Sequence, residues 1–272
     1  MTPAVQPLEL LDEAAIRRAL PEWPASRLRR LELHRVIDST SDRLLAVTDL
    51  PPRQFDVCLA EYQTAGRGRR GRRWLVPFGS GLCLSLNWCF REPPAAMSAL
   101  SLAAGVAVLR ALARLSCSGL TLKWPNDLLH EGRKLGGVLI DLRGDAAATY
   151  VVVGVGLNLR LPEPARAAAA SDGLEVTDLA ALGPPPARNA AAAALIGELA
   201  LMLEEFGARG MAAFAEEWRA ADALAGRCVR VWSGEQVIEG IARGVDGDGA
   251  LLLEAGGSQR RIRHGEVSVR TA

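Results

Sequence analysis

EYQTAGRGRRGRRW, residues Glu61–Trp74, is the stretch of this sequence that restricts the fold most strongly. Five of the seven residues from Arg67 to Arg73 are arginine, and glycines stand among them. Such a segment cannot pack in a core, but glycine backbone N–H groups and guanidinium groups together can surround an anion. It does not contain the GxxxxGK[ST] pattern of a P-loop. We therefore predict an anion-binding loop between two strands, with a basic surface loop or a nucleic-acid tether as alternatives.

The segments on either side of this loop predict an α+β protein. We expect a helix over 8–20, strands over 31–37, 57–63, 82–90, 120–123, 134–142 and 149–159, and helices over 97–115, 189–206 and 211–221. Residues 82–90 alternate in polarity, as in an antiparallel strand. The expected fold is a mixed, mostly antiparallel sheet with helices on one side. The Ala/Pro/Gly-rich residues 161–188 are expected to form a surface excursion with little structure.

The sequence changes character near residue 223. Five short strand-like segments separated by Gly-rich turns follow Ala225, which predicts a small all-β barrel. We therefore expect two domains, 1–222 (with 1–30 as an N-terminal extension) and 223–272.

Composition excludes several classes of protein. The chain has 272 residues, a net charge of +1 and 49% apolar residues, which is ordinary for a globular protein and unusual for a dedicated nucleic-acid binder. Its five cysteines never form a CxxC pair, and its three histidines lie far apart. We expect reduced thiols, no protein-built metal site, no membrane segment and a cytoplasmic location.

Three further motifs can contribute to a binding site. KWPNDLL (123–129) places an Asn-Asp turn at the end of a strand, and KLGGVLID (134–141) begins a strand with two glycines. Gly136 and Gly137 either admit a ligand close to the backbone or form a bulge. Gly154 and Gly156 of VVVGVGLNL (151–159) are equally consistent with a tight packing partner.

The basic residues are unevenly divided. Of the 32 lysines and arginines, only Lys123 and Lys134 are lysine. Codon composition explains such a bias in general. The alternative is that these two positions require a compact ammonium group rather than a guanidinium.

Taken together, these motifs resemble one family. An STS turn (39–41), EYQTAGRGRRGRRW, KWPNDLL, KLGGVLID, GVGLNL and a terminal GEVSVR occur in the order found in biotin protein ligases, also called biotin–[acetyl-CoA-carboxylase] ligases. The resemblance extends over 31–270. It implies a class II synthetase-like catalytic domain followed by an SH3-like barrel. It also implies conversion of biotin and ATP to biotinyl-5′-AMP, with transfer of biotin to a lysine of a biotin carboxyl carrier protein domain. A lipoate or other acyl–carrier ligase on the same fold is the second interpretation, and a nucleic-acid-binding protein a remote third.

The resemblance also assigns residues. It implies catalytic roles for Lys134, Arg67 and Asp127. For biotin binding it implies Ser39, Thr40, Ser41, Gln63, Arg67, Gly68, Arg69, Lys134 and Gly137. For nucleotide binding it implies Arg69, Arg72, Trp74, Lys123, Asn126 and Asn158. Mg²⁺ is expected to arrive with the ATP phosphates rather than in a dedicated protein site.

Two departures from the family pattern limit these implications. About 30 residues precede the first matching strand, too few for the winged helix-turn-helix of repressor-type members, so no DNA binding is expected. Ser41 also stands where the family commonly has Asn. Monomer and homodimer both remain open.

Overall fold

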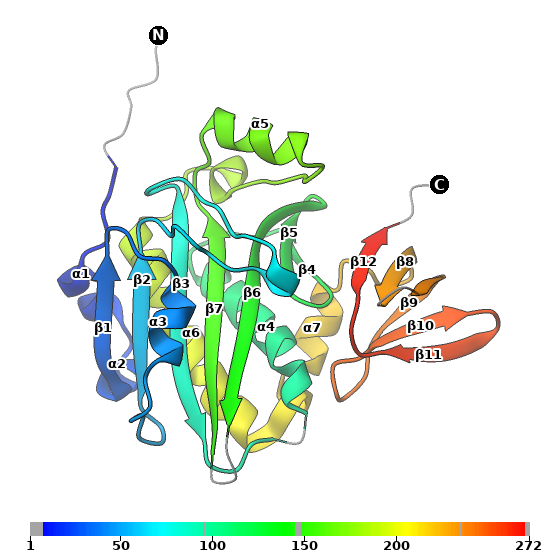
Figure 1. The fold of residues 1–272 in the computed structure, drawn as a ribbon, viewed down its shortest axis with the longest axis horizontal. Helices are drawn as coiled ribbons and strands as arrows, with labels where there is room; N and C mark the ends of the chain where they lie inside the picture. The colour runs from blue at the N-terminus through cyan, green and yellow to red at the C-terminus, as the bar shows by residue number, and fades with distance from the viewer. Residues whose placement is uncertain (1–7, 95, 145–147, 234–235, 270–272) are drawn as a thin grey trace.

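The computed structural model describes residues 8–94, 96–144, 148–233 and 236–269 (Figure 1). Its larger sheet has seven strands in the order β1-β2-β3-β7-β6-β5-β4. Among the described strands of this sheet, β1 and β2 pair in parallel and all other neighbours are antiparallel. The expected mixed, mostly antiparallel sheet is confirmed. The strands are β1 (Leu28–His34), β2 (Phe55–Ala60), β3 (Gly81–Phe90), β4 (Leu120–Lys123), β5 (Asp127–His130), β6 (Arg133–Gly144) and β7 (Thr149–Asn158).

One face of this sheet is apolar. Side chains alternate along each strand, so Leu84 and Leu86 of β3 share a face with Val153 of β7. These residues belong to the main core together with α4 (Leu100–Arg114) and α6 (Arg188–Arg209). The long helices therefore hold the sheet from one side.

The opposite face is polar and carries small residues. Ser85 and Asn87 of β3 lie on it, opposite Gly154 and Val152 of β7. Helix α3 (Thr40–Leu45) covers this face through Leu44, which packs with Cys58 and Val152 in a small separate core. Figure 1 shows α3 in front of the sheet and α4 and α6 behind it. The expectation that all helices lie on one side was wrong, because the small and polar face also needs a cover.

The N-terminal region is more structured than its prolines predict. One helix was expected over 8–20, but there are two, α1 (Glu13–Ala19) and α2 (Glu22–Arg27). Asp12 caps α1 by accepting a hydrogen bond from the Ala15 N–H at 2.7 Å, while Pro24 lies within α2. Pro24 occupies the first turn, where helices tolerate proline because the N–H groups there have no intrahelical partner.

Two further expectations need correction. The turn expected after β4 contains the short strand β5, which pairs with both β4 and β6. Residues 161–188 contain α5 (Glu163–Ser171) and the 3-10 turn η3 (Leu179–Leu182). The fully buried Asp178 anchors this excursion by accepting hydrogen bonds from Leu161 N–H and Arg166.

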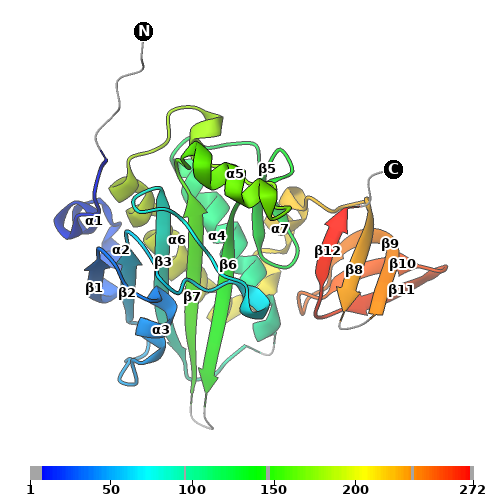
Figure 2. The same ribbon diagram turned by 45° about the horizontal axis from the view of Figure 1, so that its top comes forward.

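The C-terminal strands form a second sheet, in the order β11-β10-β9-β8-β12 (Figure 2). All its described pairs are antiparallel, and the five expected strands are present, in agreement with a small SH3-like barrel. They are β8 (Cys228–Ser233), β9 (Gln236–Val245), β10 (Leu251–Ala255), β11 (Ser258–Ile262) and β12 (Glu266–Val269). The short helix α7 (Ala215–Ala221), preceded by the 3-10 turn η4 (Gly210–Ala213), leads into this sheet.

One segment among the described residues, Met97–Arg114, has the length and composition of a membrane span. Most of it is buried inside the structure, where it includes the core helix α4. A core helix of this kind passes the same test of length and composition.

Candidate active site

The start of α3 places a row of hydroxyl groups on the polar face of the sheet. Ser39 is the N-cap residue, since its Oγ accepts a hydrogen bond from the Asp42 N–H at 3.2 Å. Gln63 Oε1 accepts from the Thr40 N–H at 2.8 Å and from the Thr40 hydroxyl at 3.1 Å. The Ser85 hydroxyl lies 2.8 Å from Thr40 Oγ1 and 3.0 Å from Ser41 Oγ. We call Thr40, Ser41, Gln63 and Ser85 the α3 cluster; all four are buried.

Glycine makes this approach possible. A Cβ at position 154 would lie 2.8 Å from Ser41 Oγ, so only glycine allows α3 to sit this close to β7. The sequence alternative for Gly154, a tight packing partner, is thereby confirmed.

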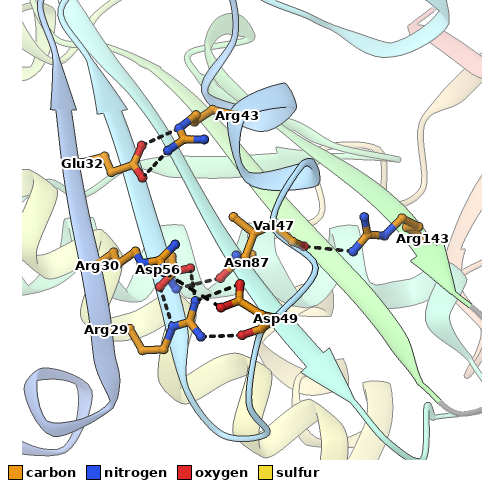
Figure 3. A network of polar contacts seen from close by, with 9 residues as sticks. All are labelled: Arg29, Arg30, Glu32, Arg43, Val47, Asp49, Asp56, Asn87 and Arg143. Atoms are coloured by element: carbon orange, nitrogen blue, oxygen red, sulfur yellow. Dashed lines mark hydrogen bonds and ion pairs between the residues drawn. The ribbon is translucent and has the colours of Figure 1, made fainter.

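Arginines fix the body of α3 from several directions (Figure 3). Arg143 of β6 donates to the backbone oxygens of Leu45 and Val47 at 3.0 and 2.9 Å. Leu45 is the last residue of α3 and Val47 follows the C-cap Ala46, so neither carbonyl has an intrahelical N–H to bind, and a cation there is favoured by the helix dipole. Arg43 of α3 itself pairs with Glu32 of β1 through two contacts of 2.7 and 2.9 Å.

The arginine-rich segment is a folded hairpin. We call Gly66–Trp74 the arginine hairpin, because the Trp74 N–H donates to Gly66 O at 2.9 Å and the Gly68 N–H to Arg72 O at 2.7 Å. At its tip Arg70 has a φ of +56°, a left-handed conformation that costs a non-glycine residue energy.

Arg67 points from this hairpin toward α3 and β6. Its guanidinium lies 2.5 Å from Asp141 and 3.1 Å from Asp42. Arg67 is therefore held between two carboxylates at the edge of the α3 cluster. A carboxylate ligand placed here would be a third acceptor for the same guanidinium.

Trp74 connects the hairpin to the rest of the site. A Cβ at Gly156 would overlap the indole ring, so Trp74 packs directly against the backbone of β7 at this glycine. Lys134 Nζ lies 5.9 Å from the centroid of the same ring, in cation–π range. The sequence analysis allowed that Gly156, like Gly154, makes room for a tight packing partner, and the Trp74 ring is that partner.

Both lysines of the chain lie in one charged group. Lys134 Nζ is 2.6 Å from Asp127 Oδ1. Burial lowers the pKa of Lys123, with Lys134 and Arg72 adding to the shift and Asp127 and Glu266 opposing it. Burial likewise lowers the pKa of Arg69, and Asp127 and Glu266 again oppose the shift. Cations desolvated in this way are suited to an anionic ligand.

The turn 123–127 is held on several sides. The Trp124–Pro125 peptide is cis. The Asn126 amide donates to Val138 O at 2.7 Å, and the Val138 N–H donates back to Asn126 O at 2.9 Å. Gly137 follows the bulge at Leu135, and a Cβ there would meet only ordinary contacts at 3.5–3.6 Å. The bulge alternative is confirmed beside Gly136, whereas the approach of a ligand to the backbone at Gly137 stays a prediction.

The excursion 161–188 returns to this site. Lys134 is paired through its backbone with Glu175 O at 2.8 Å and with the Thr177 N–H at 2.9 Å. The buried Asn158 donates its amide to Thr177 O at 3.0 Å. Asn158, predicted as a nucleotide ligand, thus has a structural partner in this state of the protein.

One group of three metal-ligating side chains, Glu32, His34 and Cys58, occurs in the described part of the chain. Glu32 is already paired with Arg43, and burial raises the pKa of the Cys58 thiol to about 12. A protonated thiol and a neutralised carboxylate make a poor cation site.

The structure brings several of the predicted residues together in two groups. One group lies at the start of α3 and contains Ser39, Thr40, Ser41 and Gln63; the other contains Lys134, Asp127 and Trp74. Arg67 reaches α3 through Asp42. Sequence reasoning missed Ser85, Asp42, Asp141 and Glu266. Ser85 had a signal, a polar residue inside the apolar strand LCLSLNWCF, whereas Glu266 meets Arg72 (2.5 Å) only because two sheets come together.

Comparisons with known proteins agree with this geometry. Residues 33–158 match the Biotin/lipoate A/B protein ligase family, and residues 225–270 match the Biotin protein ligase C terminal domain. The Bifunctional ligase/repressor BirA of Escherichia coli (strain K12) is 39% identical over 239 residues, covering 87% of this chain and 73% of that protein. The Biotin--[acetyl-CoA-carboxylase] ligase of Mycobacterium tuberculosis is 36% identical, covering 94% of this chain and 95% of that protein.

A solved structure gives the same result. The biotin protein ligase from Aquifex aeolicus in complex with biotin and ATP superposes with a TM-score of 0.75 at 26% identity, covering 90% of this chain and all of that one. The chain therefore belongs to the biotin/lipoate protein ligase family, among its biotin protein ligases.

Proposed function

We propose that this protein activates biotin with ATP and transfers the biotinyl group to a lysine of a biotin carboxyl carrier domain of a carboxylase. The observation that carries the proposal is Lys134, whose ammonium lies 2.6 Å from the Asp127 carboxylate and 5.9 Å from the centroid of the Trp74 ring. Relatives named biotin--[acetyl-CoA-carboxylase] ligase support the same activity and the class of acceptor.

The α3 cluster suits the ureido ring of biotin. That ring offers two N–H donors and one carbonyl acceptor, and the cluster offers three hydroxyls that both donate and accept, plus the Gln63 amide. The N-cap Ser39 and the backbone of Gly68 and Arg69 border the same space in this proposal. A ring with a different pattern of donors and acceptors would leave some of these buried polar groups unpaired, and its binding would therefore be disfavoured.

The cations act on the carboxylate and the phosphates. In the first step a biotin carboxylate oxygen attacks the α-phosphorus of ATP, and the bond to pyrophosphate breaks. Arg67, Lys134, Arg69 and Arg72 would neutralise the negative charges that this step brings together. Trp74 would pack against adenine, with Lys123, Asn126 and Asn158 around the nucleotide.

In the second step the ε-amine of the acceptor lysine attacks the biotinyl carbonyl, AMP leaves and an amide forms. Asp127 would orient the amine and accept its proton. Asp127 already binds one ammonium, Lys134, at 2.6 Å, so its carboxylate is suited to an incoming amine.

Mg²⁺ supplies charge neutralisation on the ATP phosphates when it is bound. The carboxylates near the charged group are engaged by cations, Asp127 by Lys134 and Glu266 by Arg72. This pairing supports a metal carried by the nucleotide rather than one held by a protein site.

The remaining expectations stay proposals. We propose a division into 1–222 and 223–272, supported by the change of sheet between β7 and β8. We also propose a cytoplasmic protein without DNA binding, and leave the choice between monomer and homodimer to measurement.

The test is biotin-dependent release of pyrophosphate from ATP by the purified protein, followed by labelling of a carrier domain. We expect release only with biotin present, and no competition from an excess of lipoate. Lipoate-dependent release would favour the second interpretation, and the absence of release with either acid would overturn the proposal.

A further inference from the structure

We propose that Trp124 is a positioning residue of the nucleotide half of the site, which it fixes by docking the C-terminal sheet against the turn 123–127. The inference rests on the proposed function. It assigns to this tryptophan a role that is separate from ligand contact, because the side chain is 2% exposed and faces the C-terminal sheet.

The contact is specific. Trp124 Nε1 donates to Gly249 O at 3.0 Å across a separation of 125 residues. Gly265, which directly precedes β12, also lies against the ring, since a Cβ there would be 3.6 Å from Trp124 Cζ3. A buried indole N–H with a single backbone acceptor loses that partner whenever the C-terminal sheet moves away.

The acceptor belongs to a rigid turn. Asp246 Oδ1 accepts from the Asp248 N–H at 2.9 Å and from the Ala250 N–H at 3.0 Å. Gly249 has a φ of +79°, and a Cβ on it would lie 2.8 Å from Ala99 Cα. Ser98 Oγ donates to Asp248 O at 2.7 Å. We call Trp124 together with the turn Asp246–Ala250 the joint.

The joint lies between two groups of the charged site. On one side, Trp124 directly follows Lys123 and precedes Asn126 and Asp127 in the chain. On the other side, β12 begins at Glu266, whose carboxylate is 2.5 Å from Arg72 and 3.9 Å from Arg70 of the arginine hairpin. A rigid joint therefore sets the distance between the turn 123–127 and the carboxylate that holds the hairpin arginines.

The α3 cluster is outside this arrangement. Its partners are α3, β3 and the Gln63 region, and within the described ranges the side-chain hydrogen bonds of its four residues stay among these elements. Loosening the joint should therefore weaken ATP use and leave biotin binding unchanged. A purely structural role would lower stability and affect both ligands alike.

The first test compares two buried tryptophans by Trp124→Phe and Trp218→Phe. Both are 2% exposed, but the indole N–H of Trp218 has no hydrogen-bond partner among the described residues. Each substitution replaces an indole ring by a phenyl ring and so removes the same atoms. Only Trp124→Phe also removes a hydrogen bond, the one from Trp124 Nε1 to Gly249 O. We expect the KM for ATP to rise about tenfold in Trp124→Phe, which corresponds to about 1.4 kcal/mol. Trp218→Phe should stay near wild type, and the biotin Kd from calorimetry should change in neither variant.

The second test uses two glycines with positive φ. Gly249→Ala places a methyl group against Ala99, whereas Gly257→Ala carries a similar backbone strain (φ +76°) with nothing within 4 Å. We expect Gly249→Ala to raise the KM for ATP as Trp124→Phe does and Gly257→Ala to leave it unchanged. Thermal unfolding of all four variants monitors folding.

Hydrogen exchange gives a readout independent of turnover. The Asn126 and Val138 amides, bonded to Lys123 O and Asn126 O, should exchange faster in Trp124→Phe than in Trp218→Phe. Equal KM values for ATP in the two tryptophan variants would overturn the inference, as would parallel changes in ATP and biotin binding. The proposed function would still stand in that case, provided that the wild type releases pyrophosphate in the presence of biotin. A wild type that binds neither ligand overturns both.

Discussion

The two halves of the site are built on opposite physical principles. The α3 cluster is buried and uncharged, and its groups satisfy one another by hydrogen bonds that join α3 to Gln63 and to β3 of the larger sheet. The charged half, from Arg67 through Lys134 to Arg72, consists of partly exposed ion pairs that draw on both sheets. Burial gives the first half specificity, because an unpaired group there has no water to replace its partner. Exposure lets the second half exchange its carboxylate partners for phosphate.

The largest effect is expected in the charged half, from Lys134→Arg. The Lys134 ammonium fits within 2.6 Å of Asp127 and beneath Trp74, and its Cε is 3.6 Å from the Cβ position of Gly137. A planar guanidinium needs more room and cannot act as a compact point charge. We expect biotin-dependent pyrophosphate release to slow about a hundredfold, as for the loss of a preorganised electrostatic contact.

The neighbouring Arg133 provides the control for this prediction. It lies on the same strand, is 45% exposed in its side chain and pairs only with Glu131 among the described residues. Arg133→Lys should therefore retain full activity. Near-normal turnover of Lys134→Arg would return the two lysines to an accident of codon composition and remove the argument that this half needs a point charge.

Local sequence signals predicted the fold where the contacts are local. Alternation in LCLSLNWCF identified β3 and its antiparallel pairing. Strand β5 was missed because four residues inside a turn-like motif carry no periodicity of their own. Its existence depends on pairing with β4 and β6.

The site shows the same division. The family resemblance implied roles for Lys134 and Asp127, which turn out to be an ion pair. It could not predict that Arg67 meets Asp141, 74 residues away, or that Arg72 meets Glu266, 194 residues away. Such pairs depend on how strands and sheets come together, and side-chain charge alone does not select one carboxylate among 31 acidic residues.

A smaller effect, confined to the other half, is expected from Ser85→Ala. Ser85 Oγ is the shared partner of the Thr40 and Ser41 hydroxyls, at 2.8 and 3.0 Å. Removing it leaves two buried hydroxyls with a lost partner, at a cost of about 1–3 kcal/mol. We expect the biotin Kd to rise about tenfold by calorimetry, with the KM for ATP unchanged at saturating biotin.

Ser171→Ala is the matched control, since that hydroxyl donates to Ala167 O on the exposed helix α5. It should alter neither constant. If Ser85→Ala changed the ATP constant as much as the biotin constant, the two halves would be one coupled network, and the contrast between them would fail.

The smallest effect is expected from Arg143→Met, which tests whether the support of α3 matters to the cluster above it. Methionine retains much of the apolar stem of Arg143 but loses the two bonds to Leu45 O and Val47 O and the stacking over Tyr150 at 5.2 Å. Those carbonyls are near the surface, so water replaces part of what is lost. Because Leu44 and the Arg43–Glu32 pair still hold α3, we expect the biotin Kd to rise only about threefold, equivalent to about 0.6 kcal/mol.

Arg230→Met is the control for Arg143→Met, because Arg230 also stacks over an aromatic ring (Trp232, 5.9 Å) and pairs with Glu239, but does so on the C-terminal sheet. It should leave biotin binding unchanged. A rise as large as that of Ser85→Ala would mean that α3 moves as a unit and that the cluster depends on its anchors rather than on its own hydrogen bonds. No rise at all would mean that the buried hydroxyls fix the start of α3 by themselves. That result would strengthen the contrast with the charged half, where Arg67, Lys134 and Arg72 each pair with a carboxylate from another element.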